Sequence, residues 1–453
     1  EVFELNVESG GTLIIGNDLI FNSTGGTITN TTFDIEGTVT IGNNLSLDQS
    51  GLGIKSKITV NTGGILNLKD VTFTAVADDK LELEMNGTAI MNISGSINVG
   101  SPAYGVINAT GSSTVNFVGT GNQIIPGTSG SGTGDAFNFQ NIVVNNSFSS
   151  VPQLRLAGDF TFTGDFSFTD GVVSGEGFNF TVPNSASVSG GNAGSYLDGK
   201  MVVDASFISF SGGFNFPVGD GQYWAPIDMA NLTNDVTSTY EVEYFASGYS
   251  DTTTVGDELV YISTEEYWEI SRTSGAGNVD ITFHWKDSAR SKTYDATDIV
   301  IGHYNGSDWG SVGATSSVDG LAGSVTASTV SDFSPFSFGF KTPPISLPVE
   351  LISFEASLVD EGILISWITA AEINNEKFEL ERSYNGEDFE PVQVEYGQGN
   401  TSEMTHYSWV DKGVVTAGNL VYYRLKQIDF DGAFAYSDII IVLTEPSDAQ
   451  QTI

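Results

Sequence analysis

The stretch GGTLIIGNDLIF (Gly10–Phe21) returns in similar form as GTVTIGNNLSL (Gly37–Leu47) and as GGILNLKDVTF (Gly63–Phe73). Apolar and polar residues alternate in each copy, which is the period of a β-strand with one buried face. Similar bursts continue to about Val118, roughly 22 to 27 residues apart. A unit repeated at this period buries its apolar side against its neighbours, which predicts a parallel β-helix or related β-solenoid. A β-sandwich with evenly spaced strands is the alternative.

Glycine and asparagine mark the expected corners of the coils. We expect positive φ angles at the glycines that precede the bursts, namely Gly10, Gly11, Gly37, Gly63, Gly64 and Gly87. Asn17, Asn43 and Asp70 share one register and suggest a side-chain ladder or left-handed corners. The run at 119–134, GTGNQIIPGTSGSGTG, predicts a long loop. Alternation then resumes, and the repetitive region is expected to span residues 1–200.

Composition excludes several classes of function. The chain has 453 residues, with 16 Lys and Arg against 56 Asp and Glu, for a net charge of −40. Such a charge opposes binding to nucleic acid or to an anionic membrane surface. No run approaches the roughly 18 apolar residues of a membrane-spanning helix, so we expect no membrane insertion. The absence of cysteine excludes disulfides and thiolate chemistry.

Residues 201–342 show longer alternating strands with tryptophans, such as EEYWEISR (Glu265–Arg272) and VDITFHWK (Val279–Lys286). This pattern predicts an antiparallel β-sandwich. With FNFPVGDG and FSPFSF, the segment resembles a module of large surface and secreted proteins of Bacteroidota. Its aromatic residues either stack on sugars or fill the core; the candidates are Tyr223, Trp224, Trp268 and Trp309.

A proline-rich linker at 343–346 precedes a second predicted sandwich at 347–443, and a polar tail follows at 444–453. GILISW and KFELERS alternate as strands, Trp367 suits a buried core position, and DFDG suits a hairpin turn. With AEINN (371–375) and YYRL (422–425), this segment resembles the fibronectin type III-like domain that precedes the sorting domain of type IX secretion cargo in Bacteroidota.

That resemblance implies export to the cell surface or the extracellular space. Cargo of this system loses an N-terminal signal peptide and a C-terminal sorting domain during export. The sequence shows neither segment, so we interpret the chain as a mature exported protein. A truncated chain would have the same sequence.

Residues suited to catalysis are sparse. The three histidines, His284, His303 and His406, lack a partner at metal-ligand spacing and are interpreted as solvated or core-edge residues. No G-x-S-x-G elbow joins a strand to a helix. A polysaccharide lyase or hydrolase is the enzymatic alternative, but the first arginine is Arg155 and the Asp78-Asp79 pair lies in a polar turn. We therefore predict that the protein is not an enzyme and has no organic cofactor.

Acidic loops leave calcium binding open. The candidate ligands are Asp251, Asp257 and Glu258 in one loop and Asp429 and Asp431 in another. The complete D-x-D-x-D-G loop with a terminal Glu is missing. Asp-Ser/Thr triplets resemble Bacteroidota O-glycan acceptors and mark Thr252 and Ser288 as candidate glycosylation sites.

The sequence thus predicts an all-β protein, with an N-terminal β-solenoid, parallel β-helix-like, followed by two antiparallel β-sandwich domains. Alternation begins at once in EVFELNV, without a capping segment. An open end of this kind suggests head-to-tail stacking or strand donation between copies. The candidate self-assembly residues are Glu1, Val2, Phe3, Glu4, Leu5, Asn6 and Val7. We predict a secreted structural protein that forms an extracellular fibre or surface layer, with copies of itself or other cell-surface components as partners; the alternatives are a glycan-binding adhesin and a carbohydrate-active enzyme.

Overall fold

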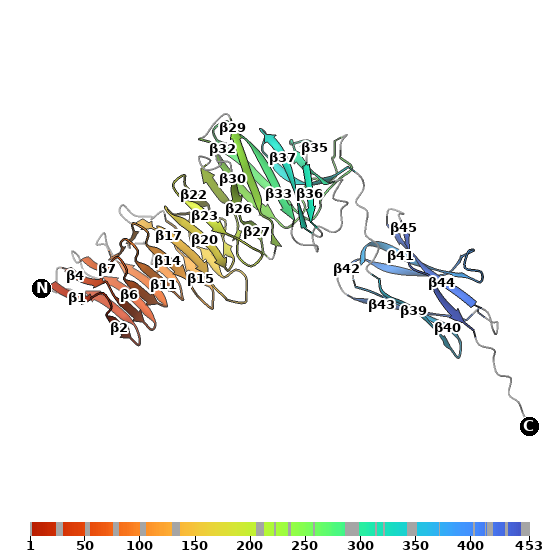
Figure 1. Ribbon diagram of the computed structural model, residues 1–453, viewed down its shortest axis with the longest axis horizontal. Helices are drawn as coiled ribbons and strands as arrows, with labels where there is room; N and C mark the ends of the chain where they lie inside the picture. The colour runs from red at the N-terminus through yellow and green to blue at the C-terminus, as the bar shows by residue number, and fades with distance from the viewer. Residues whose placement is uncertain are drawn as a thin grey trace, which may run out of the picture. The chain divides into compact units, whose positions relative to one another are not determined.

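The computed structural model contains strands and no helix in the described part of the chain, and hence no helix that could cross a membrane there (Figure 1). The described residues are 2–23, 30–49, 55–75, 81–99, 106–128, 136–204, 213–221, 223–233, 237–256, 259–285, 299–312, 315–319, 322–341, 351–370, 372–401, 404–412, 414, 420–430 and 434–444. The chain forms two compact units, Glu1–Pro343 and Pro344–Ile453.

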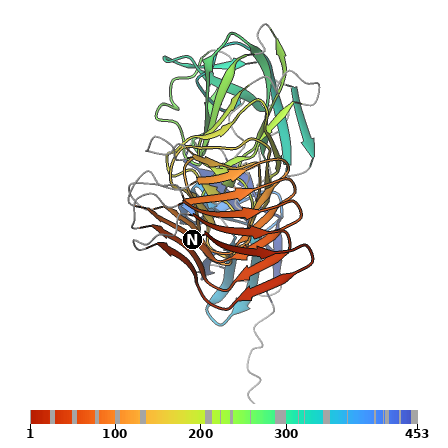
Figure 2. The same ribbon diagram turned by 90° about the vertical axis from the view of Figure 1, so that its left-hand side faces the viewer.

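Unit 1 begins with a β-solenoid (Figure 2). Each of its first four coils contributes three strands, one to each of three sheets. Sheet 1 contains β1 (Val2–Val7), β4 (Asn30–Ile35), β7 (Lys55–Val60), β10 (Leu81–Met85), β13 (Val106–Ala109) and β16 (Ala136–Asn138). Sheet 2 contains β2 (Thr12–Ile15), β5 (Thr38–Ile41), β8 (Ile65–Leu68), β11 (Ile90–Ile93), β14 (Thr114–Phe117), β17 (Asn141–Asn145), β20 (Asp165–Asp170) and β23 (Ser187–Gly190). Sheet 3 contains β3 (Leu19–Ser23), β6 (Asn44–Gln49), β9 (Asp70–Ala75) and β12 (Ile97–Val99).

Later coils use sheet 4, which contains β15 (Gln123–Ile125), β18 (Leu154–Leu156), β21 (Val173–Ser174), β24 (Leu197–Asp198), β27 (Val218–Asp220) and β28 (Tyr223–Trp224). Because β15 lies inside the segment 119–134, the prediction of a long loop or insertion was wrong for residues 123–125, whereas 129–134 lie outside the described residues. Its Gln123 is buried and donates through Nε2 to the main-chain oxygen of Ile93 at 2.9 Å. Gln123 is thus a buried polar residue and Ile124 an exposed apolar one, so Ile125 is the one buried apolar residue of this short strand and hydrophobic alternation did not reveal it.

Register explains why the sequence repeats. Leu13 pairs with Val39, Val39 with Leu66, and Met91 with both Leu66 and Val115, each pair in parallel strands. Identical register places inward side chains of successive coils directly above one another, so each buries its neighbour. The predicted parallel β-solenoid is confirmed, and the sandwich alternative for this region was wrong.

The corner glycines serve two different purposes. Gly10, Gly63 and Gly87 have φ angles of +78°, +81° and +60°, as predicted. Gly37 and Gly64 do not have positive φ; instead, a Cβ added to either would lie 2.3 Å from a main-chain oxygen of the preceding coil. Gly11 also lacks a positive φ, so the prediction of positive φ was wrong for Gly11, Gly37 and Gly64. At Gly37 and Gly64, glycine is required because two backbones approach closely.

The adjacent residues Gly63 and Gly64 allow an experiment that separates the need for a positive φ from the need for close backbone approach. Gly63→Ala has open space around the new Cβ and incurs only left-handed strain, about 1–2 kcal/mol. Gly64→Ala forces Cβ against the Ile35 carbonyl oxygen, so we expect a larger loss in the free energy of unfolding. Denaturant unfolding of both variants measures the difference; an equal or smaller loss for Gly64→Ala would contradict the close-approach explanation.

The side-chain ladder lies in a different column from the predicted one. Asn67 Nδ2 donates to Thr40 Oγ1 at 3.2 Å, Asn92 Nδ2 to Asn67 Oδ1 at 2.7 Å, and Asn116 Nδ2 to Asn92 Oδ1 at 2.7 Å. Asp70 instead accepts from the Ser96 main-chain N–H at 2.6 Å. These outward amides link four coils, because the strands hold equivalent residues in register.

The solenoid continues directly into the first sandwich. Sheet 5 contains β19 (Phe160–Thr161), β22 (Phe180–Val182), β25 (Met201–Asp204), β30 (Thr239–Phe245), β31 (Tyr261–Ile262), β32 (Tyr267–Ser274), β34 (Ile299–Tyr304), β35 (Trp309–Val312) and β38 (Pro335–Phe340). Sheet 6 contains β26 (Phe214–Phe216), β29 (Ile227–Thr233), β33 (Asn278–Trp285), β36 (Thr315–Asp319) and β37 (Ala322–Val330). Strand β25 pairs with β22 in parallel and with β30 in antiparallel orientation. One hydrophobic core therefore runs from Val7 to Phe340.

Unit 2 is a separate antiparallel two-sheet domain. One sheet contains β39 (Leu351–Val359), β40 (Gly362–Thr369) and β43 (Thr405–Asp411). The other contains β41 (Glu372–Ser383), β42 (Glu390–Thr401), β44 (Leu420–Asp429), β45 (Phe434–Tyr436) and β46 (Ile440–Leu443). Trp367 is buried and stacks on Tyr407 with ring centroids 5.2 Å apart, as expected of a sandwich core.

A buried carboxylate gives the AEINN segment of unit 2 a structural role. Glu372 accepts hydrogen bonds from Tyr407 Oη at 2.6 Å, Thr369 Oγ1 at 3.0 Å, Asn375 Nδ2 at 2.8 Å and the Gln398 main-chain N–H at 2.8 Å. A buried charge is tolerated when donors surround it in this way. The carboxylate thereby connects both sheets.

Replacing Glu372 with glutamine should destabilise unit 2 by about 1.5–3 kcal/mol, because an amide cannot accept from donors on both of its atoms. Hydrogen–deuterium exchange in peptides from β40 and β43 would report the loss. Glu379→Gln is the control, since Glu379 pairs with Lys426 on the surface at 3.6 Å and should cost less than about 1 kcal/mol. Equal effects would contradict the role of Glu372.

Candidate functional site

The first coil of the solenoid has an incompletely covered apolar interior. Leu5, Leu13 and Ile15 pack against the core but stay half-buried. Their counterparts one coil later, Phe33, Val39 and Ile41, are at most 2% exposed. The difference arises because each later coil is covered on both sides, whereas among the described residues the first is covered on one side.

The outer backbone edge of the first coil also has no pairing strand among the described residues. Within the described chain, β1, β2 and β3 pair only with β4, β5 and β6, respectively. Their outer edges carry free N–H and C=O groups, as edge strands do. Two large side chains on the same coil, Ile14 and Ile20, are 73% and 57% exposed. We call the outer edges of β1–β3 with these apolar side chains the open end.

The predicted self-assembly segment forms part of the open end. Val2 to Val7 constitute β1, in which Glu4 and Asn6 are exposed and Val7 is buried. Glu1 and the side chains of Val2 and Phe3 lie outside the described residues. The sequence prediction named only this strand, because the contributions of β2 and β3 depend on the coil geometry.

The acidic loops are only partly described. Asp251 Oδ1 accepts from the main-chain N–H groups of Thr253 at 3.0 Å and Thr254 at 3.2 Å. The hydrogen bond from Thr253 is the main cause that lowers the pKa of Asp251. Asp429 is buried and accepts from Gln427 Nε2 at 3.0 Å.

The remaining calcium candidates Asp257, Glu258 and Asp431 lie outside the described residues, as does Ser288. In the part that the structure describes, no group of three or more His, Asp or Glu side chains is arranged to hold a metal. Calcium binding therefore stays a prediction. Thr252 is half-buried beside Asp251, and its glycosylation also stays a prediction.

The histidines occupy separate positions. His284 Nε2 lies 2.6 Å from Asp228 Oδ2, and His406 is exposed on β43. His303 Nε2 forms a 2.7 Å hydrogen bond with Ser334 Oγ, and its ring lies 4.8 Å from that of Phe336. Burial lowers the pKa of His303 below its ordinary value of 6.5.

This shift predicts a pH effect on unit 1. The folded state favours the neutral imidazole, so its contribution to stability is complete above about pH 6.5 and is lost as the pH falls through that value toward the folded-state pKa. We expect His303→Gln to remove this part of the acid sensitivity. Unfolding free energies between pH 7.5 and 5 would show it as a pH-dependent difference from the unmodified chain, whereas a constant difference would contradict the assignment.

Two aromatic candidates for glycan stacking are in the core. Trp268 and Trp309 are fully buried, with Nε1 donating to the main-chain oxygens of Ala225 at 3.0 Å and Asp251 at 2.6 Å. Their faces contact other aromatic rings, including Phe283 for Trp268. Tyr223 and Trp224 are half-buried. Trp268 and Trp309 thus fill the core, and their faces are not available for stacking on sugars.

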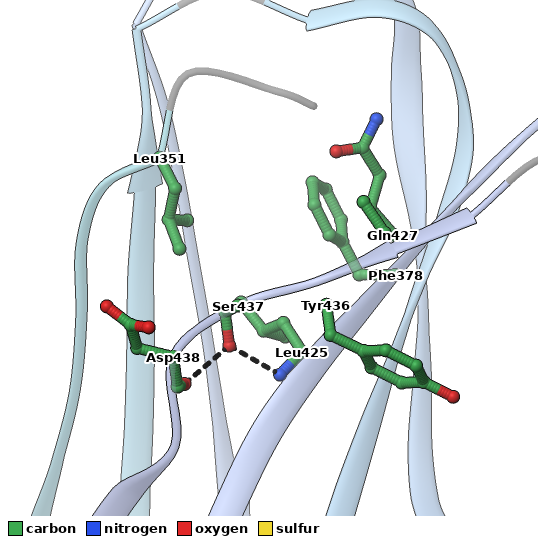
Figure 3. Close-up of a pocket in the computed structure, with 8 residues that line it drawn as sticks. Leu351, Phe378, Leu425, Gln427, Tyr436, Ser437 and Asp438 are labelled. Atoms are coloured by element: carbon green, nitrogen blue, oxygen red, sulfur yellow. Dashed lines mark hydrogen bonds between the residues drawn. The ribbon is translucent and has the colours of Figure 1, made fainter. Parts of the chain in front are cut away.

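Unit 2 contains a pocket between its sheets that the sequence did not reveal (Figure 3). It encloses about 330 Å³ and is lined by Leu351, Phe378, Leu425, Gln427, Ala435, Tyr436, Ser437 and Asp438. At its rim, Ser437 Oγ accepts from the Leu425 N–H at 2.9 Å. The lining mixes apolar side chains, such as Phe378 and Leu425, with the polar side chains of Gln427, Ser437 and Asp438, so it does not single out one class of ligand. The walls come from strands distant in sequence, so no motif marks the pocket.

No protein-family model matches the sequence, and no curated protein matches it. Among solved structures, the chain is similar to a protein described as beta-1,2-glucanase from Parabacteroides distasonis, with 14% identity and a TM-score of 0.16. The similarity covers 50% of this chain and 33% of the glucanase chain. At this TM-score, the similarity carries no argument about activity.

Proposed function

We propose that this chain is a secreted structural protein of the bacterial cell surface that self-assembles into an extracellular fibre or surface layer, with the open end as a contact between copies. The observation that carries the proposal is the half-exposed interior of the first coil beside three unpaired strand edges. Strand edges recruit other strands through main-chain hydrogen bonds. A second copy offers the same edges and the same apolar cross-section.

The energetic gain has two sources. Completing the burial of each half-exposed side chain contributes roughly 1 kcal/mol, about half the value for a fully buried Leu or Ile. Pairing the edges satisfies main-chain groups. At the other end of the solenoid, β25 already pairs with β30 of the sandwich. The two solenoid ends thus differ, which favours a two-fold pairing of open ends over head-to-tail stacking of solenoids. Such a pairing closes a dimer, so growth into a fibre or layer requires a further contact elsewhere on the chain.

Location at the cell surface rests on composition and resemblance. A net charge of −40 and the absence of cysteine suit an exported, highly solvated protein. The two-sheet architecture of unit 2 agrees with the fibronectin type III-like domain that the resemblance implies. Antibody labelling of intact cells tests this location.

A charge at the open end should prevent association. Leu19→Lys places an ammonium group among the half-buried side chains that pack against the core of the first coil, and we expect end-on assembly to weaken at least tenfold. Sedimentation velocity and negative-stain electron microscopy over a concentration series, with and without calcium, measure this effect. Calcium dependence of the assemblies would also test the predicted calcium sites.

Ile124→Lys is the matched control, because Ile124 is 39% exposed on β15, away from the open end. A folded domain fused before Glu1 provides a second block that alters no core residue. A chain that remains monomeric at high concentration would overturn the proposal, as would assemblies unaffected by both Leu19→Lys and the fusion. Monomers that bind a glycan array would instead favour an adhesin.

A further inference from the structure

The outer surface of sheet 2 is free of charge over six consecutive coils. The strands β2, β5, β8, β11, β14 and β17 contain no Asp, Glu, Lys, Arg or His. Charge first appears in this sheet at Asp165 of β20. We call the outward surface of these six strands the neutral face. The outer surface of sheet 1 differs, since there Lys57 pairs with Glu84 and lies beside Glu82.

The neutral face is regular and fixed in conformation. Thr38, Ile65, Ile90 and Thr114 form one outward column, in which the paired strands keep identical register. The second column is the ladder of Thr40 and three asparagines, whose side chains hydrogen-bond to one another. Side chains already held in place lose little conformational entropy on contact, which favours binding.

Among the described residues, no strand covers the neutral face. Short described corners flank it, such as 8–11 between β1 and β2 and 16–18 between β2 and β3. No strand of unit 1 among the described residues pairs over this face.

Net charge selects the occupant. Copies of a chain with a charge of −40 repel one another, so a homotypic contact is least opposed where both surfaces are neutral. Two copies also present strands at the same spacing, about 4.8 Å, so their rungs can interdigitate as in packed sheets. We propose that two copies of the chain pack laterally, neutral face to neutral face.

The size of the face sets the strength of this contact. Four-residue strands about 13 Å long, in a ladder about 24 Å deep, give roughly 300 Å² per copy. A stable dimer typically buries about 800 Å² per partner. The lateral contact is therefore weak for an isolated pair and becomes effective where many copies are held together. The contact meets the open end at β2, where Ile14 lies in register with Thr40, and otherwise uses residues of later coils. Disulfide trapping can capture it even where it is weak.

The absence of cysteine allows a direct test in the full chain. Thr114→Cys places a thiol on the neutral face, and Asn108→Cys places one on the outer surface of sheet 1 in the same coil. Under mild oxidation at equal protein concentration, we expect at least fivefold more disulfide-linked dimer from Thr114→Cys. The yield should rise with NaCl, because salt screens the repulsion between copies.

Two further variants keep the test decisive. Adding Ile90→Glu to Thr114→Cys should lower the dimer yield to that of Asn108→Cys, with an unchanged melting temperature confirming the fold. Fusing a folded domain before Glu1 should leave the Thr114→Cys dimer intact, even though it blocks the open end. Equal yields from the two cysteine variants, or a yield that falls with salt, would overturn the lateral contact without bearing on the open end.

Discussion

Parallel hydrogen bonding between successive coils is the constraint on which unit 1 depends. A strand in one coil must have the same length and register as its counterpart in the next, because a slip of one residue would turn its inward side chains to solvent. This requirement explains why apolar and polar residues alternate in the strands that contain Val39, Leu66 and Met91. It also explains the close backbone approach at Gly37 and Gly64. It also aligns the outward asparagines, whose hydrogen bonds are worth about 1 kcal/mol each.

The same ladder determines where the solenoid stops. At β25 the neighbouring strand changes from parallel to antiparallel, and the core passes into the sandwich without a break. The sandwich thus covers one end of the coil stack with its own sheet. The first coil has no comparable cover among the described residues, and this asymmetry between the ends underlies the proposed assembly.

Local patterns predicted local features of the fold. Strict alternation and a fixed spacing located the coils, and Trp367 in a strand pattern located the core of unit 2. The strand β15 escaped prediction because it has only three residues, and the buried polar Gln123 and the exposed Ile124 hide the alternation to which the buried Ile125 belongs. The open end was predicted only in β1, and the neutral face was not predicted, because both combine residues from strands about 25 residues apart that only the coil register brings together.

The connections of the solenoid differ in their freedom to vary. Gly37 and Gly64, on one side of sheet 2, contact the backbone of the preceding coil, so an added residue there would break the register of every later coil. Longer connections occur elsewhere: 24–29 and 100–105 join sheet 3 to sheet 1, and 146–153 joins sheet 2 to sheet 4. Insertions are tolerated thermodynamically in such connections far better than in tight corners. The length of the chain in this solenoid can therefore vary in these longer connections, whereas the register holds the corners at Gly37 and Gly64 to a fixed length.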